Sequence, residues 1–194
     1  MDSQEYYNQY ATQYFENSVN LDVSHLIEPF MEHLEEGSAV LDLGCGSGRD
    51  CLTFLDAGYD VTALDGSSEM CALAEIHTDL EVLNMYYEEL DFEEVFDGIW
   101  ALASLVHIEK SLLPTILKKV SSALNNEGIF FASFHKGTST EIRDQRFFCE
   151  YSEDELVSLI KLFPEFSILS LWETTETRTD GIKREWLNLL LRKQ

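Results

Sequence analysis

The fold class is decided by one stretch of the chain, from Val40 to Asp50, which reads V-L-D-L-G-C-G-S-G-R-D. A short apolar strand leads there into a loop with glycine at alternate positions, Gly44, Gly46 and Gly48, and a helix follows. Glycine lets a backbone turn sharply and approach a ligand, while amides at the helix start point at that ligand. The stretch therefore predicts a nucleotide-like ligand above the carboxyl end of the first strand.

The spacing of these glycines disfavours two common nucleotide-binding loops. A dinucleotide-binding loop, G-x-G-x-x-G, would have its third glycine at the position of Arg49. A phosphate-binding P-loop would need G-K-[ST], and the first lysine of the chain is Lys110. Asp42 adds a second criterion, because a carboxylate within a buried strand is costly unless a cation or several donors satisfy it. A ligand with an ammonium and a sulfonium suits this strand better than a pyrophosphate or NAD.

The length and composition indicate one globular domain. The chain has 194 residues, 45% of them hydrophobic, and only three prolines. We expect a single domain over residues 1–194, with residues 1–20 covering the substrate and residues 135–150 as a candidate lid loop. No apolar run is long enough to span a bilayer, and the first residues lack a signal peptide pattern, so we expect a cytoplasmic protein. The four cysteines show no C-x-x-C spacing, which favours reduced thiols over disulfides or a metal site.

The charge is divided unevenly along the chain. Of a net charge of −23, residues 1–109 carry 24 acids against one base, Arg49, whereas residues 110–194 carry 12 acids and 12 bases. Such a first half repels phosphate backbones and anionic lipids, so nucleic acid and membranes are disfavoured as partners. We expect most of these acids to form a solvated surface, with Asp42 and Asp65 as exceptions.

Hydrophobic periodicity predicts helices and strands in alternation. The expected helices span residues 21–36, 49–57, 67–77, 111–124 and a last stretch from 152 to about 164, and the expected strands span residues 39–43, 60–64, 80–84, 96–102, 128–134, 166–172 and 183–190. Alternating strands pair in parallel, whereas the last two, joined by a polar turn centred on Asp180-Gly181, pair antiparallel. The predicted fold is α/β: a doubly wound, Rossmann-like, seven-stranded, mostly parallel sheet with an antiparallel C-terminal strand and helices on both faces.

Asp65 ends the second predicted strand, 21 residues after Gly44. An acid at this place accepts hydrogen bonds from both hydroxyls of a ribose. The alternative is a structural role at the start of the next helix, where Ser67 or Ser68 is expected to be the cap. Both roles of Asp65 are compatible with each other.

Four motifs in this order resemble the class I S-adenosylmethionine-dependent methyltransferases. They read V-L-D-L-G-C-G-S-G-R-D, V-T-A-L-D-G-S-S-E-M, F-D-G-I-W-A-L-A-S-L-V-H-I and L-N-N-E-G-I-F-F-A-S-F, and together they cover almost the whole chain. The last departs from the L-K-P-G-G that the family more often has. More loosely, the small chain with a C-terminal E-W-L-N resembles bacterial stand-alone methyltransferases of the tellurite-resistance or small-molecule type.

The resemblance implies S-adenosylmethionine as the methyl donor and S-adenosylhomocysteine as the product. Gly44, Gly46 and Gly48 would border the methionine and ribose parts, Asp42 would organise the loop or the ammonium, and Asp65 would bind the ribose diol. The other implied cofactor residues are Cys45, Arg49, Gly66, Ser67, Met70, Tyr87, Glu88, Ala101, Leu102 and Ser104. The family often has an acid for the adenine amino group where this chain has Tyr86 and Tyr87, so backbone groups or Glu88 are the expected substitutes.

Arg49 opens a helix, where its charge opposes the helix dipole, so it needs an anionic partner. That partner is either the methionyl carboxylate of the cofactor or one of the abundant acids of the chain.

His107 is the first candidate for a catalytic base, because it follows the fourth strand and histidine takes up protons near neutral pH. A structural role for His107 is the alternative, and His135 at the end of the fifth strand is a second candidate. Lys136, Arg143 and Arg146 form a basic cluster that predicts a small anionic acceptor, although local acids could also pair with them. Tyr10 and Tyr14 are expected beside the acceptor.

Three functions are compatible with these motifs. The chain could be a small-molecule methyltransferase, a tRNA methyltransferase with a basic partner subunit, or a cofactor-binding protein without catalysis. The charge distribution favours the first function over the second. The oligomeric state is left open between a monomer and a homodimer.

Overall fold

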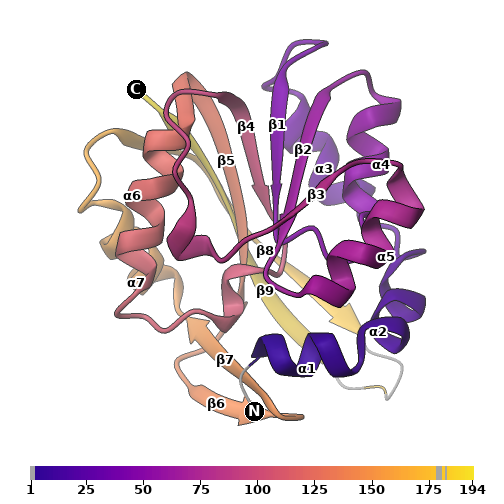
Figure 1. The fold of residues 1–194 in the computed structure, drawn as a ribbon. Coiled ribbons are helices and arrows are strands. Elements are labelled where there is room, and N and C mark those ends of the chain that lie inside the picture. The colour runs from indigo at the N-terminus through magenta and orange to yellow at the C-terminus, as the bar shows by residue number, and fades with distance from the viewer. Residues whose placement is uncertain (1–2, 178–180, 182) are drawn as a thin grey trace.

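The structure is a computed structural model that describes residues 3–177, 181 and 183–194. Strands β1 (Ala39–Leu43), β2 (Asp60–Asp65), β3 (Val82–Asn84), β4 (Phe96–Ala101) and β5 (Leu124–Lys136) are parallel and lie in the order β3-β2-β1-β4-β5 (Figure 1). Strand β9 (Lys183–Lys193) runs antiparallel between β5 and β8 (Phe166–Thr177). The predicted doubly wound α/β fold with a reversed C-terminal strand is therefore confirmed.

Helices cover both faces of the sheet. One core places α3 (Ser24–Met31), α4 (Arg49–Asp56) and α5 (Ser68–Thr78) against Val40, Trp100 and Phe131 of the sheet. The other core places α6 (Leu113–Ala123) and α7 (Glu153–Ile160) against the opposite face. Successive residues of β1 serve opposite faces, since Val40 belongs to the first core and Leu41 to the second.

The sequence placed most helix boundaries closely. Ser67 caps α5, because its side chain accepts a hydrogen bond from the amide of Met70. Ser152 and Glu155 form the expected capping box ahead of α7. The predicted helix over residues 21–36 was too long, because the Asp22 carboxylate accepts hydrogen bonds from the amide and hydroxyl of Ser24 and delays the helix to that residue.

Residues 135–150 do not form an irregular loop. Strand β5 continues to Lys136, and β6 (Thr140–Arg143) pairs antiparallel with β7 (Arg146–Tyr151). Asp144 and Gln145 join them with φ of 50° and 66°, which is the geometry of a tight two-residue hairpin turn. The described sheet thus has nine strands instead of the seven expected.

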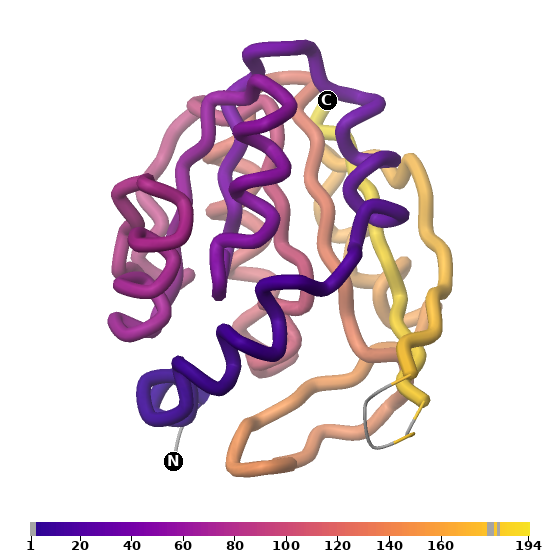
Figure 2. Tube along the Cα trace, turned by 90° about the vertical axis from the view of Figure 1, so that its right-hand side faces the viewer, coloured from indigo at the N-terminus to yellow at the C-terminus, as the bar shows by residue number. Residues whose placement is uncertain are grey.

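Two helices that the sequence did not predict lie at the N-terminus, α1 (Ser3–Gln9) and α2 (Ala11–Ser18). They lie at the same end of the molecule as the β6–β7 hairpin (Figure 2), and the amide of Phe147 in β7 donates a hydrogen bond to the hydroxyl of Ser3. Short 3-10 turns, η1 (Tyr87–Glu89) and η2 (Leu105–His107), complete the elements around this end. Asp180 of the expected final turn lies outside the described residues, and no helix in the described part of the chain is long and apolar enough to cross a membrane.

Candidate active site

The glycine loop brings backbone close to other backbone and side chains. Gly44 has φ of +84°, and a Cβ placed there would lie 2.5 Å from the Tyr87 hydroxyl and 2.6 Å from Cβ of Ser104. The amides of Gly44 and Cys45 both donate to the carbonyl of Leu64, which fixes the loop against the end of β2. Gly48 precedes α4 with φ of +73°, a conformation that side chains with a Cβ rarely adopt. A side chain would therefore collide with Tyr87 and Ser104 at Gly44, and with Thr78 at Gly48, so both positions require glycine.

Asp65 connects the glycine loop to the start of α5. Its Oδ2 accepts a hydrogen bond from the amide of Gly46 over 3.0 Å, and its Oδ1 accepts one from the amide of Ser67 over 2.8 Å. Burial raises the pKa of Asp65 despite these two hydrogen bonds, which lower it. Each carboxylate oxygen keeps a further lone pair for a ligand hydroxyl, so the structural role and the ribose role are compatible.

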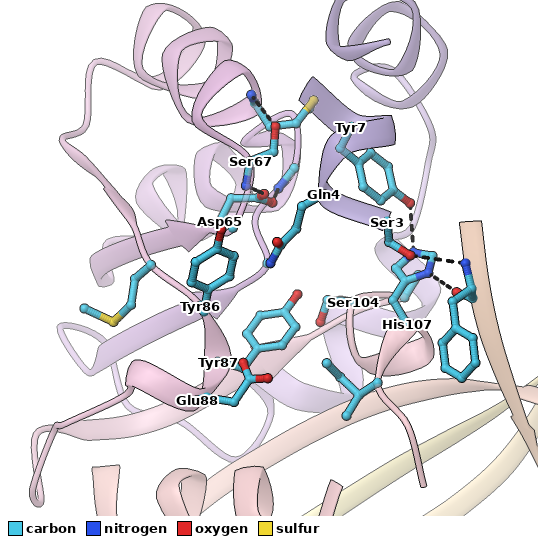
Figure 3. A pocket seen from close by; sticks show the side chains of 18 of the residues that line it. Ser3, Gln4, Tyr7, Asp65, Ser67, Tyr86, Tyr87, Glu88, Ser104 and His107 are labelled. Atoms are coloured by element: carbon cyan, nitrogen blue, oxygen red, sulfur yellow. Dashed lines mark hydrogen bonds between the residues drawn. The ribbon is translucent and has the colours of Figure 1, made fainter. Parts of the chain in front are cut away.

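A first cavity of about 500 Å³ opens at these residues (Figure 3). It is lined by ten of the expected cofactor residues: Gly44, Gly46, Asp65, Gly66, Ser67, Met70, Tyr87, Glu88, Leu102 and Ser104. The hydroxyl of Ser104 is buried there beside the hydroxyl of Tyr87, which is its hydrogen-bond partner. Buried hydroxyls and a glycine cradle in one cavity of this size fit a polar, nucleotide-sized ligand.

Five expected cofactor residues do not line this cavity: Asp42, Cys45, Gly48, Arg49 and Ala101. Asp42 lies behind the loop, where Cys51 donates a hydrogen bond to its Oδ2 over 3.1 Å. Burial, and then the neighbouring Asp50 carboxylate, raise the pKa of Asp42 to about 8. Asp42 therefore does not line the cavity, and its side chain instead contacts α4 through Cys51.

Arg49 has a partner within the chain. Its Nε and Nη2 donate to the two oxygens of Asp50 over 2.6 and 3.0 Å, and Nη1 donates to the carbonyl of Ser18. Asp50 also accepts from Nε1 of Trp100 over 2.9 Å. Of the two partners considered for Arg49, the structure contains the neighbouring acid.

The N-terminal helices form a wall of the first cavity. The sequence predicted that residues 1–20 cover the substrate, but it predicted neither their helices nor their contact with the expected cofactor residues. Ser3, Gln4, Tyr7 and Tyr14 line the cavity, and the side chain of Gln4 projects into it (Figure 3), with its amide beside Gly66. Asn8 fastens this wall to α5, because its side-chain oxygen accepts a hydrogen bond from the Ser67 hydroxyl over 2.7 Å. These residues are polar and lie on short helices, so only tertiary contacts reveal their place.

A second cavity of about 640 Å³ shares part of its lining with the first. The residues common to both, which we call the shared wall, are Tyr7, Tyr14, Leu102, Ala103 and His107. The second cavity also holds Tyr10, His135, Arg143 and Arg146, which the sequence placed beside an acceptor. Lys136 is not part of it, because its ammonium pairs with Glu173 over 2.7 Å outside the cavity.

His107 has both ring nitrogens engaged. Nδ1 lies 2.7 Å from the carbonyl oxygen of Phe147, which only accepts, so Nδ1 carries the proton. Nε2 therefore accepts, and it lies 2.9 Å from the Tyr7 hydroxyl, which donates (Figure 3). Burial lowers the pKa of His107 to about 4, so the ring is neutral at pH 7.

The other candidate base, His135, faces two arginines. Its Nδ1 lies 3.3 Å from Nη2 of Arg143 and 3.4 Å from Nη1 of Arg184, so Nδ1 accepts. Burial, followed by the charges of Arg184 and Arg143, lowers the pKa of His135 to about 3. A further proton on His135 is therefore strongly disfavoured.

Several residues of the second cavity were missed from the sequence. Ser133 and Asn188 are fully buried and face each other across β5 and β9, and Arg184 and Trp186 also line the cavity. Asn188 in the apolar run L-N-L-L-L had the same signal as Asp42, a polar residue within a buried strand. Ala103 of the shared wall has φ of +54°, and such backbone strain in a non-glycine residue is concentrated at functional sites.

Among the residues that the structure describes, no group of three or more histidines, cysteines or acids is arranged to hold a metal ion.

Comparisons with known proteins agree with this architecture. Residues 40–128 match the family model of a methyltransferase domain. A ubiquinone biosynthesis O-methyltransferase of Rhodopseudomonas palustris is 35% identical over 78 residues, which cover 38% of this chain and 31% of that protein. A probable S-adenosyl-L-methionine-dependent methyltransferase, TehB, of Haemophilus influenzae is 27% identical over 164 residues, which cover 80% of this chain and 57% of that protein. The chain thus spans about a third of the first of these relatives.

Solved structures show the same fold. The crystal structure of Burkholderia thailandensis 1,6-didemethyltoxoflavin-N1-methyltransferase, with bound 1,6-didemethyltoxoflavin and S-adenosylhomocysteine, superimposes with a TM-score of 0.73. Its sequence is 24% identical, and the match covers 100% of this chain and 92% of that one. The resemblance to class I methyltransferases is confirmed in the fold and in residues 40–128.

Proposed function

We propose that this chain, which has the fold of class I methyltransferases and a methyltransferase-domain match over residues 40–128, transfers a methyl group from S-adenosylmethionine to a small-molecule acceptor. The observation that carries the proposal is the shared wall, because two ligand-sized cavities meet there. The first cavity holds the glycine loop and Asp65, and the second holds the basic cluster. A donor in one and an acceptor in the other would meet beside Tyr7, Leu102 and His107.

The first cavity is the proposed cofactor site, with S-adenosylhomocysteine as the product it would release. Asp65 would accept hydrogen bonds from ribose hydroxyls, and Ser104 supplies a buried hydroxyl beside Gly44. When bound, S-adenosylmethionine supplies a methyl carbon on a sulfonium ion, which a nucleophile attacks by direct displacement. The chain has to align the two reactants and keep water out, for which no covalent residue is needed.

His107 is the proposed final proton acceptor, and Tyr7 is the proposed link to it. A proton leaving the acceptor passes to the Tyr7 oxygen while the Tyr7 hydroxyl proton moves to Nε2 of His107, so the number of protons is conserved. The low pKa of His107 leaves Nε2 without a proton at pH 7, so this nitrogen can take one up, and burial then favours its release. His135 has the weaker claim, because two arginines already donate to its unprotonated nitrogen Nδ1.

The acceptor is proposed to be anionic. Arg143 and Arg146 line the second cavity of a chain whose net charge is −23. Arg143 is partly neutralised by Glu141 over 2.7 Å, whereas no described carboxylate pairs with Arg146. The four buried free cysteines support a reducing compartment, the cytoplasm, as the place of action.

The first test is calorimetric titration with S-adenosylmethionine, S-adenosylhomocysteine and NAD. We expect both sulfur compounds to bind and NAD not to bind. Asp65→Ala should weaken binding at least about tenfold, because hydrogen bonds to a charged group are lost. Asp60→Ala is the matched control, since Asp60 begins the same strand at its far, exposed end. Tight binding of NAD, or equal affinities of the Asp65→Ala and unmodified chains, would contradict the proposal.

The second test is turnover with radiolabelled S-adenosylmethionine. A panel of small organic anions and bulk tRNA are offered separately as acceptors. Label in the small anions supports the proposal. Label in tRNA alone would support the RNA alternative, and binding of the cofactor without turnover of any acceptor would support a protein without catalysis.

A further inference from the structure

The lining of the second cavity includes a residue whose amide oxygen has no partner among the described residues. Asn188 is fully buried, and its Nδ2 donates to Oγ1 of Thr174 over 3.0 Å and to the carbonyl of Trp172 over 3.4 Å. The carbonyl of Trp172 can only accept, so this contact fixes which end of the amide is nitrogen. Oδ1 of Asn188 is then buried with no donor among the described residues. A buried acceptor without a donor is unfavourable, so its presence in a cavity lining points to a donor from a ligand.

Asn188 lies next to the shared wall. It is the register partner of Ser133, and the Ser133 hydroxyl oxygen accepts a hydrogen bond from the amide of Ala103 over 2.7 Å. Ala103 belongs to the shared wall. A ligand group that donates to Asn188 is therefore held beside the place where the two cavities meet.

A second unpartnered polar atom lies in the same lining. Nε of Arg146 is buried and has no hydrogen-bond partner in the described part of the chain, while Nη1 donates to the Tyr7 hydroxyl over 3.3 Å. The guanidinium of Arg146 lies 4.5 Å from the ring centre of Tyr6 and 5.2 Å from that of Phe148. Aromatic rings therefore hold this guanidinium in position, but no described anion binds it. Arginine binds a carboxylate or a phosphate with two parallel hydrogen bonds.

The walls between these two atoms are rich in aromatic rings. Tyr6, Tyr7, Tyr10, Tyr14, Phe148 and Trp186 all line the second cavity. Aromatic side chains bury a flat apolar surface best, by stacked or edge-on contact with another ring. A volume of about 640 Å³ has room for such a ring together with its substituents.

We infer that the acceptor is a planar aromatic anion with a hydroxyl or amino group, whose anionic group binds Arg146 and whose hydrogen-bond donor binds Oδ1 of Asn188. Asn188 is then a residue that determines specificity, because it accepts a hydrogen bond from the hydroxyl or amino group of the acceptor and holds that group beside the shared wall. The inference rests on the proposed function, which assigns the second cavity to the acceptor. It narrows the acceptor from small anions in general to hydroxylated or aminated aromatic acids.

The test compares three probes that share one ring: 4-hydroxybenzoate, 4-methoxybenzoate and 4-hydroxybenzamide. The methoxy compound lacks the donor for Asn188, and the amide lacks the charge for Arg146. Binding is measured by calorimetry with S-adenosylhomocysteine at saturation. We expect 4-hydroxybenzoate to bind at least about tenfold more tightly than either of the other two, because each leaves one buried group unpaired.

Two variants test which residue causes each difference in affinity between the probes. Arg146→Gln should abolish the preference for the acid over the amide, and Lys136→Gln, whose charge lies outside the cavity, should preserve it. Asn188→Leu should abolish the preference for hydroxyl over methoxy, and the probe series on the unmodified chain stands even if this variant fails to fold. Equal binding of all three probes, or no binding to a chain that binds S-adenosylhomocysteine, would overturn the inference. If the chain binds no sulfur cofactor but the probes alone show the expected pattern, the second cavity is a site for an aromatic anion, and both the proposed function and the role of this anion as methyl acceptor are refuted.

Discussion

Tyr7 donates a hydrogen bond to Nε2 of His107 across 100 residues of sequence, over 2.9 Å. The bond joins the first helix of the chain to the turn that follows β4, and both residues belong to the shared wall. The N-terminal helix therefore contributes to both cavities, and its tyrosine and the histidine form one hydrogen-bonded unit.

The first prediction concerns the dependence of stability on pH. The pKa of His107 is about 4 in the folded chain and about 6.5 when the chain is unfolded, so between these values the unfolded chain binds more protons. The free energy of unfolding should therefore fall as the pH drops from 6.5 to 4, by up to about 1.4 kcal/mol per pH unit from His107.

Urea unfolding at pH 4.5 and at pH 7.5 measures this contribution. His107→Gln should lose less stability between the two pH values than the unmodified chain does. His33→Gln, at an exposed position, is the control. An unchanged pH dependence in His107→Gln would mean that the histidine is not buried as described.

The second prediction separates close contact from backbone strain. Gly44 and Gly37 have nearly equal φ, +84° and +83°, but a Cβ at Gly37 would meet nothing within 4 Å. Gly37→Ala should cost about 1–2 kcal/mol from the left-handed backbone alone. Gly44→Ala should cost more and weaken cofactor binding, because its Cβ collides with Ser104. Chemical unfolding and calorimetry on the two variants make the comparison, and equal losses would refute the close contact.

The third prediction concerns the pair of Arg49 and Asp50. Arg49→Met leaves the buried Asp50 carboxylate with Trp100 as its remaining donor among the described contacts, and the free energy of unfolding should fall by about 3 kcal/mol. The double variant Arg49→Met/Asp50→Asn removes the uncompensated charge and should recover much of that loss. Urea unfolding of the single and double variants measures the coupling. A double variant less stable than Arg49→Met would contradict the account of this pair.

The fourth prediction concerns the turn of the β6–β7 hairpin. Gln145 has φ of +66°, and glycine is the residue that adopts this conformation without strain. Gln145→Gly should therefore raise the thermal unfolding temperature, by relief of about 1 kcal/mol of backbone strain. Thr138→Gly, at an exposed position outside the left-handed region, should lower it or leave it unchanged. A lower unfolding temperature for Gln145→Gly would refute the turn geometry.

The sequence predicted those residue positions best that local chemistry determines and that the tertiary structure leaves unchanged. Gly44, Asp65 and Ser67 follow one another at spacings that a strand, a turn and a helix cap impose, so their positions could be inferred without the fold. The hairpin was missed because Asp144 and Gln145 lack the glycine that usually marks such a turn. The N-terminal helices were missed because only Ala11 and Ser18 among their described residues are buried, which leaves little apolar periodicity to detect.

The role of Lys136 could not be inferred from its neighbours in sequence. It follows His135, a residue of the second cavity, but successive residues of a strand point to opposite faces of the sheet. Its ammonium consequently pairs with Glu173 on β8. A cluster of charges in sequence is split in this way whenever it crosses a strand, and only the register decides which charges stay together.

The β6–β7 hairpin leaves and rejoins the sheet at one place, since His135 pairs with Glu150 and Lys136 pairs with Tyr151. Residues 137–149 therefore form an inserted segment whose two ends are adjacent. A segment of different sequence could take its place between β5 and α7. The inserted segment carries Arg143, Arg146 and Phe148 but no residue of the glycine loop. Under the proposed function, exchange of these thirteen residues would replace these two arginines of the acceptor site, whereas of the described lining of the first cavity it would change Phe147 alone.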